Sequence, residues 1–509
     1  MKEELYRSIC AACDHILLAS DSTIERVSIP WLHVVREHPV FLKNYKEIVV
    51  NKNSAKMTLQ RWLRLFRNKA WWLYQLGKSI RSDGMLWYGP QDFVMQTDIL
   101  LVSHLINVSH VNLADDFYFD NLPNELVKQG HKVVIVLMNH TGQSGAELAT
   151  KCFDGAVPRV ILSGTIGIGG EITLHNQLKK EAARLRQLAR REPLGLARRV
   201  LTRASEEALS GGAHTTLRMS RQIDALVTKL QPKVIVGTHE GHAWERVIFA
   251  AARSAHPSVL CISYQHAAVF RLQHAIRRCL APKYNPDQIL TAGEVSCAQL
   301  KSSPGLEGIP ISVLGSNRCF KESTTNPERR TYTGRGDHFA VQVCLVLPEG
   351  IPSECNLMFE YSILCARANP EVEFIWRLHP IVTFESLKAQ NPKLRNHPGN
   401  IILSKATLKE DFSRSHWALY RGTTAIVQAV AAGLRPIYLQ SPGELTIDPL
   451  YELDILRVSV NSVSEFNRAI LSNIEISNVQ LESDFEQARK YCETFFTALN
   501  VGKLAALIK

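Results

Sequence analysis

Short runs of almost continuous apolar residues recur along the first half of the chain. They include TDILLVSHLI (97–106), KVVIVLM (132–138), KVIVGT (233–238) and SVLCISYQH (258–266). Longer stretches with helical periodicity separate them. Strands that are buried on both faces have continuous rather than alternating apolar patterns. The alternation therefore predicts a parallel sheet covered by helices on both faces.

The same alternation restarts in the second half of the chain. Its apolar runs include FAVQVCLVLP (339–348), VEFIWRLHP (372–380), HWALY (416–420) and RPIYL (435–439). A polar, unpatterned stretch at 316–338 separates the two series. The sequence therefore predicts an α/β protein with two Rossmann-like, doubly wound domains.

The predicted boundaries place the first domain at residues 96–315 and the second at 316–509, where further helices follow the second sheet. Residues 1–95 are predicted to form a mostly helical N-terminal extension. Two local predictions concern the first domain. The stretch 117–131 is expected to be a helix that stops near Gly130, and GTIGIGGE (164–171) is expected to be a flexible loop without dinucleotide-binding spacing.

The turn between HWALY and the helix predicted at 425–432 has the sequence Arg421-Gly422-Thr423-Thr424. Glycine lets the backbone approach a ligand, and a helix N-terminus, two hydroxyls and an arginine all favour an anion. The turn could thus hold a phosphate. Alternatively, one threonine merely caps the helix. This stretch favours neither interpretation.

In the first domain, polar residues follow two predicted strands. Glu240 comes shortly after KVIVGT, directly before Gly241, and is a candidate general base. It could instead only favour the dipole of the helix that follows. His266 ends the next run; a lone histidine there is more often structural, but two neighbouring strands with polar ends favour a site.

In the second domain, Glu349 follows one strand, and Arg377, His379 and Pro380 end another. Residues i and i+2 share a face of a strand, so Arg377 and His379 are predicted to offer two nitrogen donors to one phosphate oxygen. Glu349 could contact a ligand or simply belong to a loop. Ligands of doubly wound sheets bind beyond the carboxyl ends of the strands, so all these residues are expected in the cleft between the domains.

Composition limits the class of protein. The 509 residues are 45% hydrophobic and 21% charged, as expected for a folded globular chain, and no apolar run is long enough to span a bilayer. With no signal-peptide pattern in this sequence, we predict a cytoplasmic location. Cys10 and Cys13 form a lone CxxC among eleven dispersed cysteines, so no metal site is expected. P-loop and nucleophile-elbow motifs are missing as well.

The net charge is +11, and the excess lies mainly in two stretches, Lys56–Tyr74 and Leu178–Arg203. The first combines three arginines with three tryptophans: Arg61, Arg64, Arg67, Trp62, Trp71 and Trp72. Such stretches suit an anionic membrane face, an acidic glycan or nucleic acid, or they are solvated helix faces. No nucleic-acid-binding motif accompanies them, so we expect no nucleic-acid partner.

Together these residues resemble a known family. The layout resembles the GT-B glycosyltransferases. His239-Glu240-Gly241, His379-Pro380 and Thr423-Thr424 are similar to the acidic-acidic-Gly, His-Pro and Ser-Ser/Thr motifs of bacterial sialyltransferases and related ulosonic-acid transferases. Residues 97–440 are also similar to bacterial surface-carbohydrate biosynthesis proteins. The chain departs from the family pattern at His239, where an acid is expected, and at Thr423, where serine is commoner.

The resemblance implies an inverting, metal-independent transferase without a cofactor. Its donor would be a CMP-activated ulosonic acid and its acceptor a surface or lipid-linked glycan at the inner membrane. The first domain would hold the acceptor and the second the donor. Glu240 would be the general base, with His266 the next candidate, and His379, Thr423 and Thr424 would bind the donor phosphate. Alternatives are a UDP-sugar, GDP-sugar or CDP-glycerol transferase, a UDP-sugar 2-epimerase-like isomerase, and a non-catalytic glycan-assembly protein.

Overall fold

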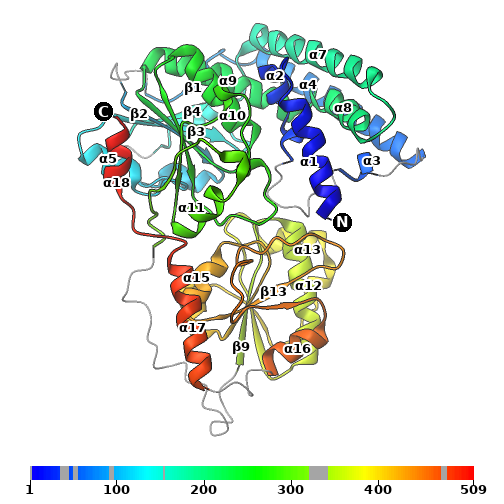
Figure 1. Ribbon diagram of the computed structural model, residues 1–509, viewed down its shortest axis with the longest axis vertical. Helices are drawn as coiled ribbons and strands as arrows, with labels where there is room; N and C mark the ends of the chain where they lie inside the picture. The colour runs from blue at the N-terminus through cyan, green and yellow to red at the C-terminus, as the bar shows by residue number, and fades with distance from the viewer. Residues whose placement is uncertain are drawn as a thin grey trace.

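The computed structural model describes residues 3–34, 45–49, 55–90, 97–152, 155–319, 342–471 and 478–508. Two sheets form two α/β domains, one above the other in Figure 1. Both sheets are doubly wound, which confirms the predicted fold class of two Rossmann-like domains. Within the described residues, no helix has the length and apolar character needed to cross a bilayer.

The first sheet has the strand order β1-β4-β3-β2-β5-β6-β7-β8. All of its neighbouring strands are parallel except β1, which pairs antiparallel with β4 at the edge. Order reverses between β2 and β5, which makes this the switch point where ligands bind. The strands are β1 (Trp87–Tyr88), β2 (Ile99–Leu105), β3 (Val133–Asn139), β4 (Arg159–Leu162), β5 (Val234–Thr238), β6 (Leu260–Gln265), β7 (Gln288–Thr291) and β8 (Ile311–Val313).

Helices cover both faces of this sheet because successive strand residues point to opposite sides. Leu100 and Val102 pack into one apolar cluster with residues of α9 and α10, whereas Ile99 and Leu101 pack into another with residues of α5. The helices of this domain are α5 (Leu122–Lys128), α6 (Gly145–Ala149), α7 (Gly167–Arg191), α8 (Leu196–Glu207), α9 (Gly211–Leu230), α10 (Ala243–Ala255) and α11 (Glu294–Lys301).

The second sheet is entirely parallel, in the order β11-β10-β9-β12-β13-β14. Its strands are β9 (Gln342–Leu347), β10 (Val372–Trp376), β11 (Ile401–Leu403), β12 (Trp417–Tyr420), β13 (Arg435–Leu439) and β14 (Val458–Val460). Its helices are α12 (Pro352–Ala368), α13 (Phe384–Gln390), α14 (Leu408–Arg414), α15 (Ala425–Ala431), α16 (Val463–Leu471) and α17 (Asn478–Glu493).

The end of the chain returns to the first domain. α17 packs against α15 of the second domain, and α18 (Val501–Ala505) then packs against α5 of the first. The backbone N–H groups of Thr497 and Asn500 donate to carbonyls of the first domain, at 3.0 and 2.8 Å. The predicted second domain, 316–509, includes α18, which packs against the first domain. Amphipathic periodicity shows that a terminal helix has an apolar side but not which domain that side packs against.

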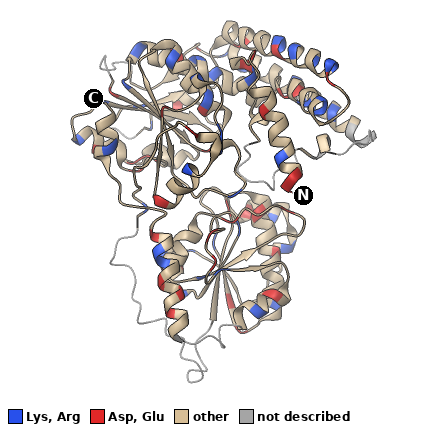
Figure 2. Cartoon of the chain, in the orientation of Figure 1, with Lys and Arg blue, Asp and Glu red and all other residues tan. Residues whose placement is uncertain are grey.

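The N-terminal extension contributes α1 (Glu3–Leu17), α2 (Ile24–Val27), α3 (Lys46–Val49) and α4 (Ala55–Ile80), which lie beside α7 and α8 (Figure 1). A buried ion pair joins the extension to the first domain: the Arg26 guanidinium lies 2.6 Å from the Glu181 carboxylate. Lys and Arg residues, blue in Figure 2, recur along α7 and α8. The extension and these helices thus form one helical layer against the sheet domain.

Two local predictions for the first domain are wrong. The expected loop at 164–171 is helical from Gly167, because Glu171 is buried there and forms an ion pair with Arg218 that fixes the first turns of α7. The expected helix from Phe117 begins only at Leu122. The buried carboxylate of Asp116 accepts hydrogen bonds from the N–H groups of Tyr118 and Phe119, both 2.8 Å, and holds a turn instead.

Candidate active site

A cavity of about 560 Å³ lies between the two domains, at the carboxyl ends of strands from both sheets. The strand-end rule therefore applies to both domains, which face one another across it. Nine of the ten residues that the sequence singles out line this cavity: Glu240, His266, Glu349, Arg377, His379, Pro380, Gly422, Thr423 and Thr424.

Glu240 lies just past β5, in the sharp turn that leads into α10. Gly241 makes this turn possible, since its φ is +88° and a Cβ atom there would lie 2.6 Å from the Cβ of Ala275. The Glu240 carboxylate has one oxygen 3.5 Å from His242 Nε2 and the other 3.5 Å from His266 Nε2. Its side chain remains 30% exposed, so a ligand in the cavity can reach it.

A second carboxylate holds this turn in place. Glu245 accepts hydrogen bonds from the backbone N–H groups of Glu240, Gly241 and His242, at 2.8, 2.7 and 3.0 Å. The Thr238 hydroxyl donates to it as well, at 2.8 Å. Buried donors need such partners. Glu245 is therefore a positioning residue, which fixes the backbone that carries Glu240.

Neighbouring histidines lower the pKa of the Glu240 carboxyl group. Burial would raise the pKa of Glu240, but the hydrogen bond from His242 and the neighbouring imidazoles outweigh burial and lower that pKa below its usual range. Burial in turn lowers the pKa of His266 to about 4, so this ring is neutral at pH 7. Glu240 is thus ionised at neutral pH, and the neutral His266 ring has its Nε2 3.5 Å from the carboxylate.

Buried histidines make the stability of the first domain depend on pH. Burial lowers the pKa of His239 to about 3, from 6.5, and His239 Nε2 lies 3.0 Å from the carbonyl of Ile276. In the unfolded chain this ring takes up a proton near pH 6.5, whereas the folded protein excludes it. Its contribution is therefore complete above pH 6.5 and is lost as the pH falls towards the folded value.

We accordingly expect the stability of the wild type to fall between pH 7.5 and 5.5. In His239→Gln the fall should be smaller by about 1.4 kcal/mol, the share of one such histidine. Urea unfolding at the two pH values measures the difference. An equally steep fall in the variant would contradict the assignment of His239 as a neutral, buried ring.

The second domain places His379, Gly422, Thr423 and Thr424 on the opposite side of the cavity. Gly350 makes room for the imidazole, because a Cβ atom at this position would lie 2.8 Å from His379 Nδ1. Burial lowers the pKa of His379, so a neutral ring can donate one N–H. Thr424 precedes α15 without capping it through its side chain, which leaves its hydroxyl available to a ligand.

Arg377 also lines the cavity, but its guanidinium already has partners. Nη1 lies 2.6 Å from the Asp411 carboxylate and donates to the carbonyl of Ala406 at 2.8 Å. β10 ends at Trp376, so Arg377 and His379 belong to a loop and the strand-face reasoning for the pair does not hold. They still border the same cavity.

Arg421 is the exception among the ten residues. It is 1% exposed and does not line the cavity. Its Nε lies 2.8 Å from Glu354, and its Nη2 lies 2.8 Å from Glu444. Two carboxylates neutralise this guanidinium inside the second domain, so the expected positive charge in the turn is not offered to a ligand there.

Several residues around the cavity were not singled out from the sequence. Arg318 lines it from the stretch between the domains, which carries no periodic pattern. Tyr118 comes from the turn held by Asp116, and Phe496 from the segment that returns to the first domain. Only the positive charge of Arg318 could have suggested a role beside an anionic ligand.

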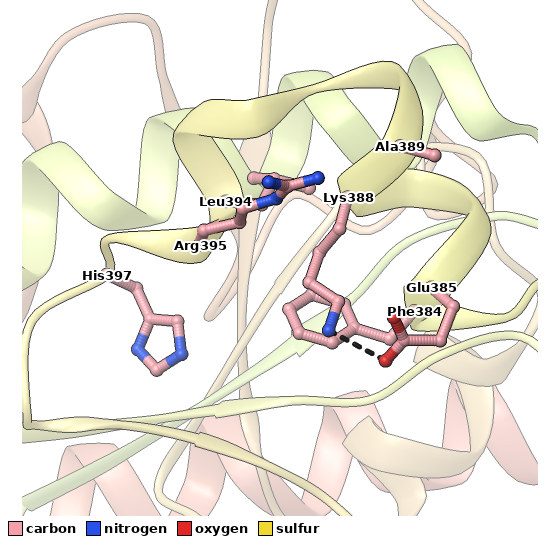
Figure 3. Close-up of a pocket in the computed structure, with 7 residues that line it drawn as sticks. All are labelled: Phe384, Glu385, Lys388, Ala389, Leu394, Arg395 and His397. Carbon is pink, nitrogen blue, oxygen red and sulfur yellow. Dashed lines mark ion pairs between the residues drawn. The ribbon is translucent and has the colours of Figure 1, made fainter.

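One further cavity adjoins this site, and another lies apart from it. One of about 160 Å³ shares Glu240, His266, Gly422 and Thr424 with the main cavity and extends it towards Gln273. The other, about 430 Å³, lies in the second domain beside α13 (Figure 3). The Lys388 ammonium group lies 2.7 Å from the Glu385 carboxylate at its edge. This cavity contains none of the ten residues.

The described residues contain no cluster of three His, Cys, Asp or Glu side chains with metal-binding geometry. The polar groups that line the cavity are the imidazoles of His266 and His379, the hydroxyls of Thr423 and Thr424, the guanidinium groups of Arg318 and Arg377, and two carboxylates, Glu240 on the first domain and Glu349 on the second. Such a set suits an anionic ligand on the second domain and a proton acceptor on the first.

Comparison with known proteins adds the following. No family model and no curated protein matches the chain. A solved structure of the glycotransferase of kitacinnamycin has 11% identity and a TM-score of 0.46, over 82% of this chain and 100% of that chain. The calicheamicin glycosyltransferase CalG4 has 14% identity and a TM-score of 0.45, over 81% and 99%.

A putative UDP-N-acetylglucosamine 2-epimerase from Listeria monocytogenes has 11% identity and a TM-score of 0.43, over 82% of this chain and 96% of that chain. Transferases and an epimerase thus have the same degree of likeness to this chain. At such identities and TM-scores, the likeness extends neither to the activity nor to the substrate.

Proposed function

We propose that this chain is a glycosyltransferase that moves a CMP-activated ulosonic acid, such as a sialic acid or Kdo, onto a growing bacterial surface glycan. The observation that carries the proposal is one cavity with Glu240 and His266 on the first domain, opposite His379 and the Thr423–Thr424 pair on the second. A base and a phosphate site on facing domains suit transfer from a nucleotide donor to a hydroxyl.

In this reaction Glu240 takes the proton of the acceptor hydroxyl as that oxygen attacks the anomeric carbon. The new bond forms as the bond between the anomeric carbon and the donor phosphate oxygen breaks, and CMP leaves with the electron pair. Direct displacement inverts the configuration. His379, Thr423 and Thr424 donate hydrogen bonds to the departing phosphate. An anionic donor beside Glu240 also raises the pKa of its carboxylate and strengthens it as a base.

The acceptor binds on the first domain, as a glycan or a lipid-linked glycan. We place the enzyme in the cytoplasm, working peripherally at the inner membrane. Its eleven cysteines are all free, as is usual in a reducing compartment.

The donor site is tested by binding. His379→Ala and the double variant Thr423→Ala/Thr424→Ala should each bind CMP about 10–150-fold more weakly, because a hydrogen bond to a charged group is worth about 1.5–3 kcal/mol. Isothermal titration measures this. His397→Ala is the matched control: His397 also precedes a proline in this domain, but it lines the cavity of Figure 3. Unchanged CMP affinity in both site variants would refute the donor site.

The nucleotide is tested by thermal shift with CMP, UDP, GDP and CDP, since a ligand that binds only the native state raises its stability. A shift largest for CMP supports the proposed donor. A larger shift for UDP or GDP would favour another sugar nucleotide or an epimerase, and one for CDP a glycerol phosphate donor. An epimerase would also convert its substrate without an acceptor.

A further inference from the structure

Helix α4 (Ala55–Ile80) is amphipathic, but its polar side faces the protein. The residues buried against the first domain and α8 are polar: Arg64, Asn68, Gln75 and Ser79, all less than a tenth exposed. Arg64 forms an ion pair of 2.8 Å with Glu206 of α8. The Gln75 amide donates to the carbonyl of Gly164 at 2.8 Å. Polar bonds thus determine which side of α4 faces inward.

The apolar side of α4 faces outward. Seven large apolar side chains there are 58–73% exposed: Leu59, Trp62, Leu63, Phe66, Leu73, Tyr74 and Ile80. At 100° per residue, these positions fall within about 120° of the helix circumference and form one continuous stripe. A stripe of this kind on a folded protein marks an interaction surface rather than scattered exposure. We call these seven residues the α4 stripe.

The charged residues of α4 itself are all basic. The sequence Ala55–Ile80 contains no aspartate or glutamate. Arg67 and Lys69 are exposed, and at 100° per residue they lie at opposite edges of the stripe. An apolar face with basic residues along its edges is typical of a helix that lies in the plane of an anionic lipid interface.

Two tryptophans that the sequence analysis placed in such a surface, Trp71 and Trp72, pack against the first domain instead. Trp72 stacks on His175, with ring centroids 4.0 Å apart, and Trp71 packs against Gly211. Arg61 pairs with Glu206, beside Arg64. The outward surface therefore depends on Trp62 and its apolar neighbours, with Arg67 and Lys69 as its cations.

We propose that the α4 stripe docks the protein on the surface of an anionic lipid bilayer. Burial of the seven apolar side chains in the interface supplies the attraction, and Arg67 and Lys69 add attraction to anionic headgroups. A second copy of this chain fits less well, because two stripes face to face would bring their basic edges together. The inference does not depend on the proposed reaction.

Flotation with vesicles tests the docking surface. The wild type should float with vesicles of phosphatidylcholine and phosphatidylglycerol at low salt, and remain unbound with phosphatidylcholine alone or at high salt. Leu63→Gln/Phe66→Gln should reduce binding at least about tenfold, since both side chains lose their apolar contact with lipid. Arg67→Gln/Lys69→Gln should reduce it about fivefold for each charge removed. All four residues face water, so circular dichroism should show an unchanged fold.

The matched control replaces exposed apolar residues outside α4. Leu364 on α12 and Val479 on α17 are 52% and 78% exposed, and Leu364→Gln/Val479→Gln should bind vesicles like the wild type. Light scattering without lipid measures whether a second copy of this chain binds the α4 stripe instead. No flotation with anionic vesicles, equal flotation of the stripe variant, or a dimer that the stripe variant dissociates would each overturn the proposal.

Discussion

Replacing Glu240 by glutamine is expected to lower turnover by about 10²–10⁴-fold, the usual contribution of a general base. The amide keeps the shape of the carboxylate and can accept one hydrogen bond, but it cannot take a proton from the acceptor. CMP affinity should stay near the wild-type value, because the groups proposed to bind the phosphate lie on the other domain. Steady-state kinetics with a CMP-sugar and acceptor, together with titration of CMP, measure both quantities.

A control variant separates a local effect from a general one. Glu307 is exposed in the same domain, and Glu307→Gln should leave turnover unchanged. If Glu240→Gln has near-wild-type turnover, the base lies elsewhere, and His266, 3.5 Å from Glu240, becomes the next candidate. If Glu240→Gln also loses CMP affinity, Glu240 supports the structure of the cleft rather than the proton transfer.

The second large effect concerns stability rather than catalysis. Arg421→Met should reduce the free energy of unfolding by about 3–5 kcal/mol, because it leaves the buried carboxylate of Glu354 without the cation that lies 2.8 Å away. The folded variant should bind CMP like the wild type, since Arg421 does not line the cavity. Urea unfolding and CMP titration distinguish the two roles.

A double variant provides the control. Arg421→Met/Glu354→Leu replaces both buried partners by apolar groups, and such replacements are often neutral, so much of the lost stability should return. The other partner, Glu444, has a side chain that is 35% exposed, so water can solvate its carboxylate once Arg421 is gone. A stable Arg421→Met protein with weakened CMP binding would instead make Arg421 a phosphate ligand.

The sequence by itself determined the two-domain α/β class and most strands. Runs such as KVVIVLM and VEFIWRLHP are apolar because both faces of their strands are covered, which is a local property of each segment. The rule that ligands bind beyond the carboxyl ends of parallel strands predicted one cleft for the ten candidate residues, and nine of them line one cavity. The rule works because these strand ends meet at one edge of each sheet.

Only the tertiary structure decided the roles of residues that look alike in the sequence. Arg377 and Arg421 both directly follow a strand. Arg421, however, pairs with Glu354, which is 67 positions away in the chain. Glu354 belongs to α12, so the ion pair depends on how that helix packs. Periodicity likewise marks α4 as amphipathic without showing which side faces water. The polar side of α4 faces inward because Arg64 pairs with Glu206 and the Gln75 amide donates to the carbonyl of Gly164, both partners being far along the chain. Local patterns record the geometry of single elements, whereas long-range packing selects the partners of each side chain.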